Sequence, residues 1–169
     1  FYVYSNAVLH TVDVSSITSI GSQIDIRSNA LLSSLGTAPA FGNLVTLGGF
    51  IKISNTLVSG VLDFSKLTAP VSGTVYDGVY ITFNSALTAV NLSNVPSING
   101  NLNLHSNSAL TAVDLRNVST ITGQFSVHTN TILHTVDLSS ITSIGSNIYI
   151  VSNTLLGSLG TAPAFGNLV

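Results

Sequence analysis

Three aspartates recur at one place in an internal repeat, and they are the side chains best suited to acid–base or metal chemistry. Asp13, Asp114 and Asp137 each lie between two branched apolar residues, and Asn91 occupies the same place in another copy. If successive copies stack as strands of a sheet, Asp114 and Asp137 would lie about 5 Å apart. Two carboxylates at that distance could share a proton, bind Ca²⁺ or flank a glycosidic bond.

A structural role is the simpler interpretation of these aspartates, because an Asp that follows a strand residue commonly lies in a solvent-facing turn. No cationic group and no acid of another type recurs beside them, so a catalytic centre would lack its partner groups. The sequence therefore predicts no catalytic residue, no enzymatic activity and no cofactor. Asp114 and Asp137 remain the candidates for a metal site, through Ca²⁺.

The four histidines fall into two pairs. His105 and His128 each lie two residues before a recurring Asn, so stacking would bring them together, but a metal site needs a third ligand. His10 and His134 each begin the string His-Thr-Val-Asp, which resembles a fragment of a catalytic triad. Residues three apart on a strand point to opposite faces, so that His and Asp cannot meet. We expect all four histidines to pack on the surface.

Two triplets match the acceptor pattern for N-linked glycosylation. They are Asn91-Leu92-Ser93 and Asn117-Val118-Ser119, one repeat apart. Such triplets also arise by chance in a chain rich in Ser, Thr and Asn. If the source secretes proteins through a glycosylating pathway, we expect sugar at these positions, particularly at Asn117.

The composition excludes several classes of protein. Charged residues make up 6% of the chain, four Lys or Arg and six acids, so no basic patch exists that could bind nucleic acid. A hydrophobic content of 45% excludes a disordered polyelectrolyte. No run of about 18 apolar residues exists that could insert into a membrane. The absence of Cys excludes disulfides and thiolate metal sites.

The chain contains a long repeat with a shorter repeat inside it. Residues 125–169 nearly copy residues 1–45, so residues 1–124 form one long unit and residues 125–169 begin the next. Along the chain an Asn recurs every 23–29 residues, with two apolar residues before it and a Leu or Val three positions after it. The recurring residues are Asn6, Asn29, Asn55, Asn84, Asn107, Asn130 and Asn153.

This pattern predicts an all-β fold without a long helix. Apolar residues are spaced alternately by two and three, as in short strands joined by bends, and no single coil could bury its apolar side alone. We expect a single continuous, right-handed β-solenoid over residues 1–169, with about seven stacked coils. The recurring Asn side chains would form a buried ladder through the stack. Gln23, Asn101, Gln124 and Asn147 would form a second ladder.

The repeat resembles the leucine-rich repeats of receptor L domains and related cell-surface proteins. The string Leu102-Asn103-Leu104-His105-Ser106-Asn107 matches the Leu-x-Leu-x-x-Asn core, and the resemblance covers nearly the whole chain. It implies a solenoid and a cell-surface or extracellular location. Receptor L domains are capped by disulfides, whereas this chain has no Cys, which favours an uncapped, continuous rod.

Residues 36–78 depart from the repeat. They contain two Thr-Ala-Pro strings and extra residues, and Pro cannot donate a ladder hydrogen bond. We expect each Thr-Ala-Pro segment to bulge from the side of the rod. Phe41 and Tyr76 lie near the expected tips of the bulges, where they would form either a small satellite core or a lateral contact with another molecule.

The function predicted from these features is structural. A chain of low charge that stacks identical coils would make a segment of an extracellular fibre or cell-surface stalk, in contact with copies of itself end to end and laterally. The alternative is an adhesion module that binds glycan or protein through residues 36–78. Ice binding is a further alternative, because four threonines fall in one column that is interrupted by Ser33: Thr11, Thr88, Thr111 and Thr135.

Overall fold

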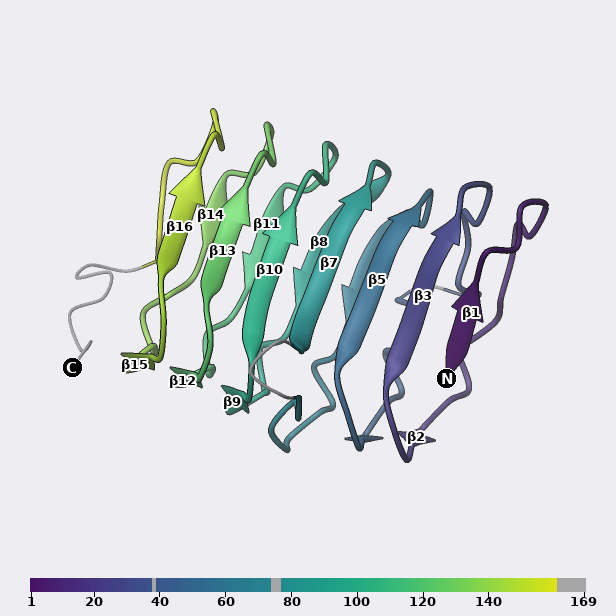
Figure 1. Ribbon diagram of the computed structural model, residues 1–169, viewed down its shortest axis with the longest axis horizontal. Helices are drawn as coiled ribbons and strands as arrows, with labels where there is room; N and C mark the ends of the chain where they lie inside the picture. Colours follow the sequence, from purple (N-terminus) through teal and green to yellow (C-terminus); the bar gives the residue numbers. More distant parts are fainter. Residues whose placement is uncertain (38, 74–76, 161–169) are drawn as a thin grey trace.

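The computed structural model is an all-β solenoid in which the chain winds repeatedly around a single apolar interior (Figure 1). The structure describes residues 1–37, 39–73 and 77–160, and these residues contain no helix. Accordingly, none of them lies in a helix that is long and apolar enough to cross a membrane. The all-β fold class predicted from the repeat is confirmed.

The largest sheet has seven strands and takes one strand from each coil. It forms the near face in Figure 1, and its strands all run in the same direction. In order across the sheet they are β1 (Tyr2–Tyr4), β3 (Ile24–Asn29), β5 (Ile51–Thr56), β7 (Gly78–Asn84), β10 (Asn101–His105), β13 (Phe125–His128) and β16 (Ile148–Val151).

Shorter strands form the other sides of the solenoid. A four-stranded sheet contains β6 (Gly60–Asp63), β8 (Leu87–Asn91), β11 (Ala112–Asp114) and β14 (Thr135–Val136). A three-stranded sheet contains β9 (Ser97–Ile98), β12 (Thr120–Ile121) and β15 (Ser143–Ile144). A two-stranded sheet pairs β2 (Ser19–Ile20) with β4 (Thr46–Leu47).

The coils stack in parallel register, and the chain winds in the right-handed sense. For example, Leu102 on β10 pairs with Val79 on β7 and with Phe125 on β13. The strands of the large sheet run upwards at the front of Figure 1, the return strands lie behind them, and the chain advances from right to left. This is the handedness that the twist of β-strands favours for parallel crossovers.

Alternation along each strand builds the core. Leu102 and Leu104 on β10 point inward with no exposed surface, as do Phe125 and Val127 on β13. Burying a side chain of this size contributes roughly 1.5–3 kcal/mol. No coil encloses these residues by itself, so the solenoid gains its stability from contacts between neighbouring coils.

A ladder of buried Asn side chains accompanies the apolar core, as the repeat predicts. The Oδ1 atom of Asn107 accepts hydrogen bonds from the backbone N–H of Asn84 at 3.0 Å and from its Nδ2 at 3.3 Å. The Nδ2 of Asn107 donates to the carbonyl of Ile81 at 2.8 Å. Asn130 and Asn153 repeat these contacts one and two coils further on. The ladder therefore satisfies backbone groups that the bend would otherwise leave unpaired.

The ladder position in the third coil is Thr56 and not Asn55, so the prediction for Asn55 is wrong. Asn55 is exposed and has a positive φ of 55°, whereas Thr56 pairs in register with Asn29 and Asn84. The hydroxyl of Thr56 donates to Oδ1 of Asn84 at 2.8 Å. The sequence spacing does not distinguish the two positions, because Asn tolerates the left-handed conformation of the bend and also fits the ladder.

The irregular coils return to the stack directly after each proline. The N–H of Ala40 donates to the carbonyl of Val61, and the N–H of Val71 donates to the carbonyl of Ser97. Phe41 is fully buried, and its ring stacks on that of Phe64 with a centroid distance of 5.3 Å. The predicted lateral contact through Phe41 is therefore wrong, because its ring fills the interior. Tyr76, the other residue of that prediction, lies outside the described residues.

Candidate functional site

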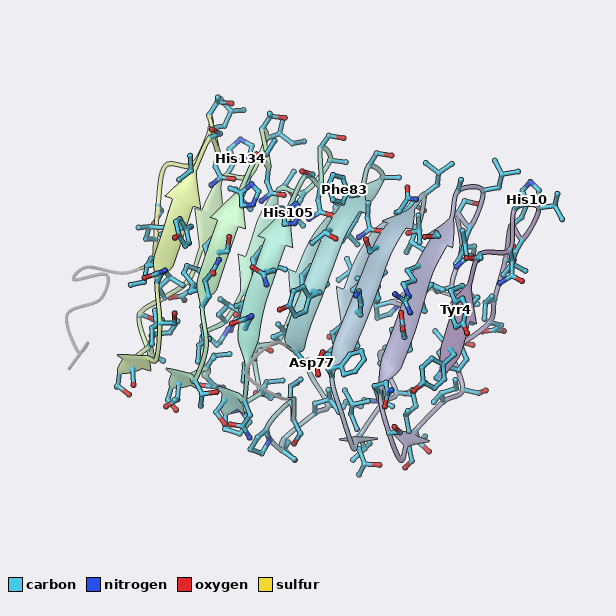
Figure 2. The ribbon with its side chains drawn as sticks, in the orientation of Figure 1. Tyr4, His10, Asp77, Phe83, His105 and His134 are labelled. Atoms are coloured by element: carbon cyan, nitrogen blue, oxygen red, sulfur yellow. The ribbon has the colours of Figure 1, made fainter. Side chains whose placement is uncertain are left out.

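The outer face of the seven-stranded sheet gathers aromatic, imidazole and amide side chains on a surface without insertions (Figure 2). Alternation along the strands points one set of residues inward and the other set toward the outer face, where Asp25 and Ser126 are nevertheless only 3% exposed. One outward row crosses all seven strands in register. Its members, from β1 to β16, are Tyr2, Asp25, Lys52, Tyr80, Asn103, Ser126 and Tyr149.

A stack of rings runs along a neighbouring part of this face. The imidazoles of His105 and His128 lie nearly parallel, with ring centroids 4.4 Å apart. Phe83 is 55% exposed and meets His105 edge-on at 5.0 Å. Burial, with a smaller contribution from His128, lowers the pKa of His105 below its ordinary value. The prediction that this histidine pair would stack on the surface is confirmed.

Tyrosine hydroxyl groups on the face are held by amide side chains. Nδ2 of Asn101 donates to the Tyr80 hydroxyl at 2.8 Å, and Nδ2 of Asn147 lies 3.3 Å from the hydroxyl of Tyr149. Gln23 makes the corresponding contact with Tyr2. These amides belong to the predicted second ladder. Among the described residues, one contact links two of its members: the N–H of Gln124 donates to Oδ1 of Asn101 at 2.7 Å. Their main partners are tyrosines, so the prediction of a second ladder is only partly correct.

A shallow groove of about 440 Å³ lies on this face at β13 and β16. It is lined by Gln124, Ser126, His128, Tyr149 and Val151. These five side chains provide an aromatic ring, an aliphatic contact and several hydrogen-bonding groups. Such a mixture of apolar area with a few polar groups is typical of a site that binds a small ligand.

The two halves of the face differ in charge. On β3 and β5, Arg27 pairs with Asp25 at 3.1 Å and lies over the ring of Tyr4, and Lys52 lies over the ring of Tyr80. The outward side chains of β7, β10, β13 and β16 include no Asp, Lys or Arg. We call these outward side chains, together with Gln124 and Asn147 directly before β13 and β16, the uncharged strip: Tyr80, Thr82, Asn101, Asn103, His105, Gln124, Ser126, His128, Asn147, Tyr149 and Val151.

Sequence reasoning missed this face, although it contains four of the five tyrosines. The signal is available in the sequence, because Tyr2, Tyr4, Tyr80 and Tyr149 each directly follow or precede an inward apolar residue of the repeat. The recurrence of Asp and Asn drew the prediction to the turns instead. The aromatic residues vary from coil to coil, so they do not register as a motif.

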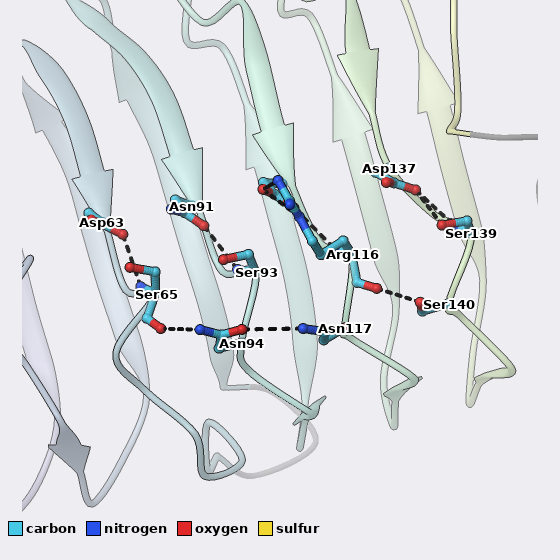
Figure 3. A network of polar contacts seen from close by, with 11 residues as sticks. Asp63, Ser65, Asn91, Ser93, Asn94, Arg116, Asn117, Asp137, Ser139 and Ser140 are labelled. Carbon is cyan, nitrogen blue, oxygen red and sulfur yellow. Dashed lines mark hydrogen bonds and ion pairs between the residues drawn. The ribbon is translucent and has the colours of Figure 1, made fainter.

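The aspartate column serves as a series of turns on the opposite side of the solenoid (Figure 3). Oδ1 of Asp137 accepts from the N–H of Ser139 at 3.0 Å, and Asn91 makes the same bond to Ser93 at 3.0 Å. Asp63 and Asp13 repeat the arrangement two residues before Ser65 and Ser15. This local bonding stabilises a bend in each coil and accounts for the recurrence of Asp or Asn there.

Asp114 has a cationic partner that the sequence pattern did not reveal. Its carboxylate pairs with the guanidinium of Arg116, whose Nε lies 3.0 Å from both carboxylate oxygens. The hydrogen bond from Arg116 lowers the pKa of Asp114, and the hydrogen bond from Ser15 lowers that of the exposed Asp13. Within the described ranges no group of three or more potential ligands is placed to hold a metal ion. The pairing with Arg116 occupies one of the two candidate Ca²⁺ ligands, Asp114 and Asp137.

The two glycosylation triplets differ in accessibility. Asn117 is exposed, and its Nδ2 makes a contact of 3.3 Å with Oδ1 of Asn94. Asn91 is half-buried, and Ser93 of its triplet is only 9% exposed. Of the two, Asn117 therefore has the accessible side chain that modification requires.

The threonine column proposed for ice binding does not form. Ala112 on β11 pairs with Thr135 on β14 and with Ala89 on β8, so Thr111 is in line with Thr88 and with His134. The exposed His134 and His10 lie at the bends of their coils (Figure 2). The row therefore contains two successive threonines and then a histidine.

Comparison with family models, with curated proteins and with solved structures gives no match. The resemblance to leucine-rich repeats therefore stays a prediction from the sequence.

Proposed function

We propose that the chain is a segment of a stiff, extracellular β-solenoid, either a fibre or a cell-surface stalk. In this role the stack holds other parts of an assembly at a fixed distance and performs no chemistry. The proposal rests on one observation, the contact between successive long units inside the chain.

The junction between the two long units lies between β10 and β13. Four consecutive residues of β10, Leu102 to His105, pair in register with Phe125 to His128 of β13. The Asn ladder continues across the same junction, because the N–H of Asn107 donates to Oδ1 of Asn130 at 3.0 Å. The junction between units thus uses the same contacts as the interfaces within a unit, so a further unit could be added in the same way.

The arrangement also supports stiffness. Each coil is bound to the next by backbone hydrogen bonds on several sides and by the buried ladder. In a stack of this kind the stability increases with the number of interfaces between coils. The exposed Asn117 would carry sugar in an extracellular setting.

Proteins with one, two and three copies of the 124-residue unit would test the proposal. Each added unit of five coils should lengthen the particle by about 24 Å in small-angle X-ray scattering, and the unfolding temperature should rise with unit number. Negative-stain electron microscopy of the longer arrays should show straight rods. Units that move independently, like beads on a flexible chain, would contradict the proposal.

A recognition role through residues 36–78 has lost one of its two predicted contact residues, because Phe41 is buried. The outer face of the large sheet carries exposed aromatic residues, among them Tyr2, Tyr4 and Tyr149.

A further inference from the structure

We propose that the uncharged strip of the large sheet binds a linear, neutral, β-1,4-linked glycan that lies across the strands from β7 to β16. The strip has a tyrosine on its first and on its last described strand, Tyr80 on β7 and Tyr149 on β16, three coils apart in the same register row. At a coil spacing of about 4.8 Å the two rings are about 14 Å apart along the solenoid.

The two tyrosines are the aromatic rings of the strip on which sugar rings can stack, and the ammonium of Lys52 lies 5.9 Å from the centroid of the Tyr80 ring. Tyr149 is 44% exposed, and Tyr80 is partly exposed. The face of an aromatic ring is electron-rich, so it attracts the C–H groups on the flat side of a pyranose. The amides of Asn147 and Asn101 hold the two hydroxyl groups, so less side-chain freedom is lost when a ligand binds.

Between the tyrosines the floor is polar. Asn103 and Ser126 lie in the same row between the two rings, and Gln124 and His128 line the groove beside Tyr149. Ser126 is only 3% exposed, so Asn103, Gln124 and His128 are the groups that can donate to and accept from sugar hydroxyl groups. An extended β-1,4-linked chain advances by about one coil spacing for each sugar residue, so each coil can meet one residue.

Charge determines which glycan the strip fits. Its four strands present no outward Asp, Lys or Arg, and the cation that borders the strip is Lys52 on β5, at the Tyr80 end. Arg27 and Lys52 lie on β3 and β5, where they contact Tyr4 and Tyr80. A neutral polymer therefore matches the strip better than an acidic one.

Isothermal titration calorimetry of the whole chain with cellohexaose and with chitohexaose would test this inference. We expect saturable binding of at least one of them, and binding of hexagalacturonate at least about ten-fold weaker. Tyr149→Ala and Tyr80→Ala should each weaken the affinity about ten-fold, which corresponds to the loss of one stacking contact. Tyr4→Ala is the matched control, because Tyr4 is 52% exposed on the same sheet but outside the strip.

A second measurement on the unmodified chain covers the case in which a variant fails to fold. In NMR spectra recorded during titration with the bound hexasaccharide, the imidazole C–H signals of His105 and His128 should shift, while those of His10 and His134 should not. Failure of both neutral hexasaccharides to bind would overturn the inference. Tighter binding of the acidic one, or an equal loss in Tyr4→Ala, would overturn it as well.

Discussion

The interior of the solenoid differs between the coils before β7 and the coils from β7 onward. From β7 to β16 the coils are regular, and an unbroken ladder links Asn84, Asn107, Asn130 and Asn153. In the coil of β5, Thr56 replaces the ladder Asn, and the fully buried rings of Phe41 and Phe64 stack on each other. Both regions have ladder hydrogen bonds, but the second combines a single Thr with a stacked aromatic pair where the first has an Asn in every coil.

The largest effect should come from the aromatic pair. Phe41→Ala removes a fully buried ring and leaves a cavity beside Phe64, which should lower the free energy of unfolding by about 4 kcal/mol in urea titrations. The matched control is Phe83→Ala, because Phe83 is 55% exposed and also has a positive φ. If both variants lose the same small amount, Phe41 does not contribute to the core as described.

Breaking the ladder should have the next largest effect. Asn107→Ala leaves the N–H of Asn84 and the carbonyl of Ile81 without these partners in the interior, at a cost of about 3 kcal/mol. Asn55→Gly should leave stability nearly unchanged, because Asn55 is exposed and glycine accepts its positive φ. Equilibrium unfolding of both variants measures the difference, and equal losses would refute the assignment of the ladder to Thr56 in that coil.

A smaller loss is expected where the ladder is already altered. Thr56→Val keeps the side-chain shape and removes the hydroxyl that donates to Oδ1 of Asn84. Asn84 keeps its bond to the carbonyl of Ile53, so we expect a loss of about 1 kcal/mol in urea titrations. A loss as large as that of Asn107→Ala would mean that the ladder is equally strong in both regions.

The smallest effect concerns pH and belongs to the regular region. The pKa of His105 is lowered in the folded chain, chiefly by burial, so the unfolded chain binds more protons once the pH falls below about 6.5. The free energy of unfolding should therefore decrease slightly as the pH falls through that value. His105→Gln should flatten this dependence, whereas His134→Gln, an exposed control, should not. An unchanged pH profile in His105→Gln would contradict the assignment.

The repeat predicts the regular region better than the irregular one, and the reason is physical. Inward apolar residues and ladder Asn obey a period because each must match its neighbour in the stack, so Leu102, Leu104 and Asn107 can be assigned from spacing alone. Asn55 shows the limit, since one residue type suits two adjacent positions. Phe41 shows a second limit. It lies in an insertion that has no counterpart in the regular coils, so the repeat cannot indicate that its ring points inward.

The candidate site is hard to predict for the opposite reason. Outward residues make few contacts that the stack requires, so they vary freely, and Tyr80 is followed one coil later by Asn103 and then by Ser126. Only the three-dimensional register shows that Tyr149 returns to the same row three coils on.

The pairing of β10 with β13 has a consequence for how such a gene can change. The contacts at the unit junction are the same in kind as those within a unit. Unequal recombination between two near-identical copies would therefore add or remove a whole unit, and the new junction would have the same contacts as the existing ones. Copy number, and with it the reach of the rod, could therefore vary between related strains or alleles while the fold stays the same. Sequencing the locus in related individuals should then show lengths that differ by whole units.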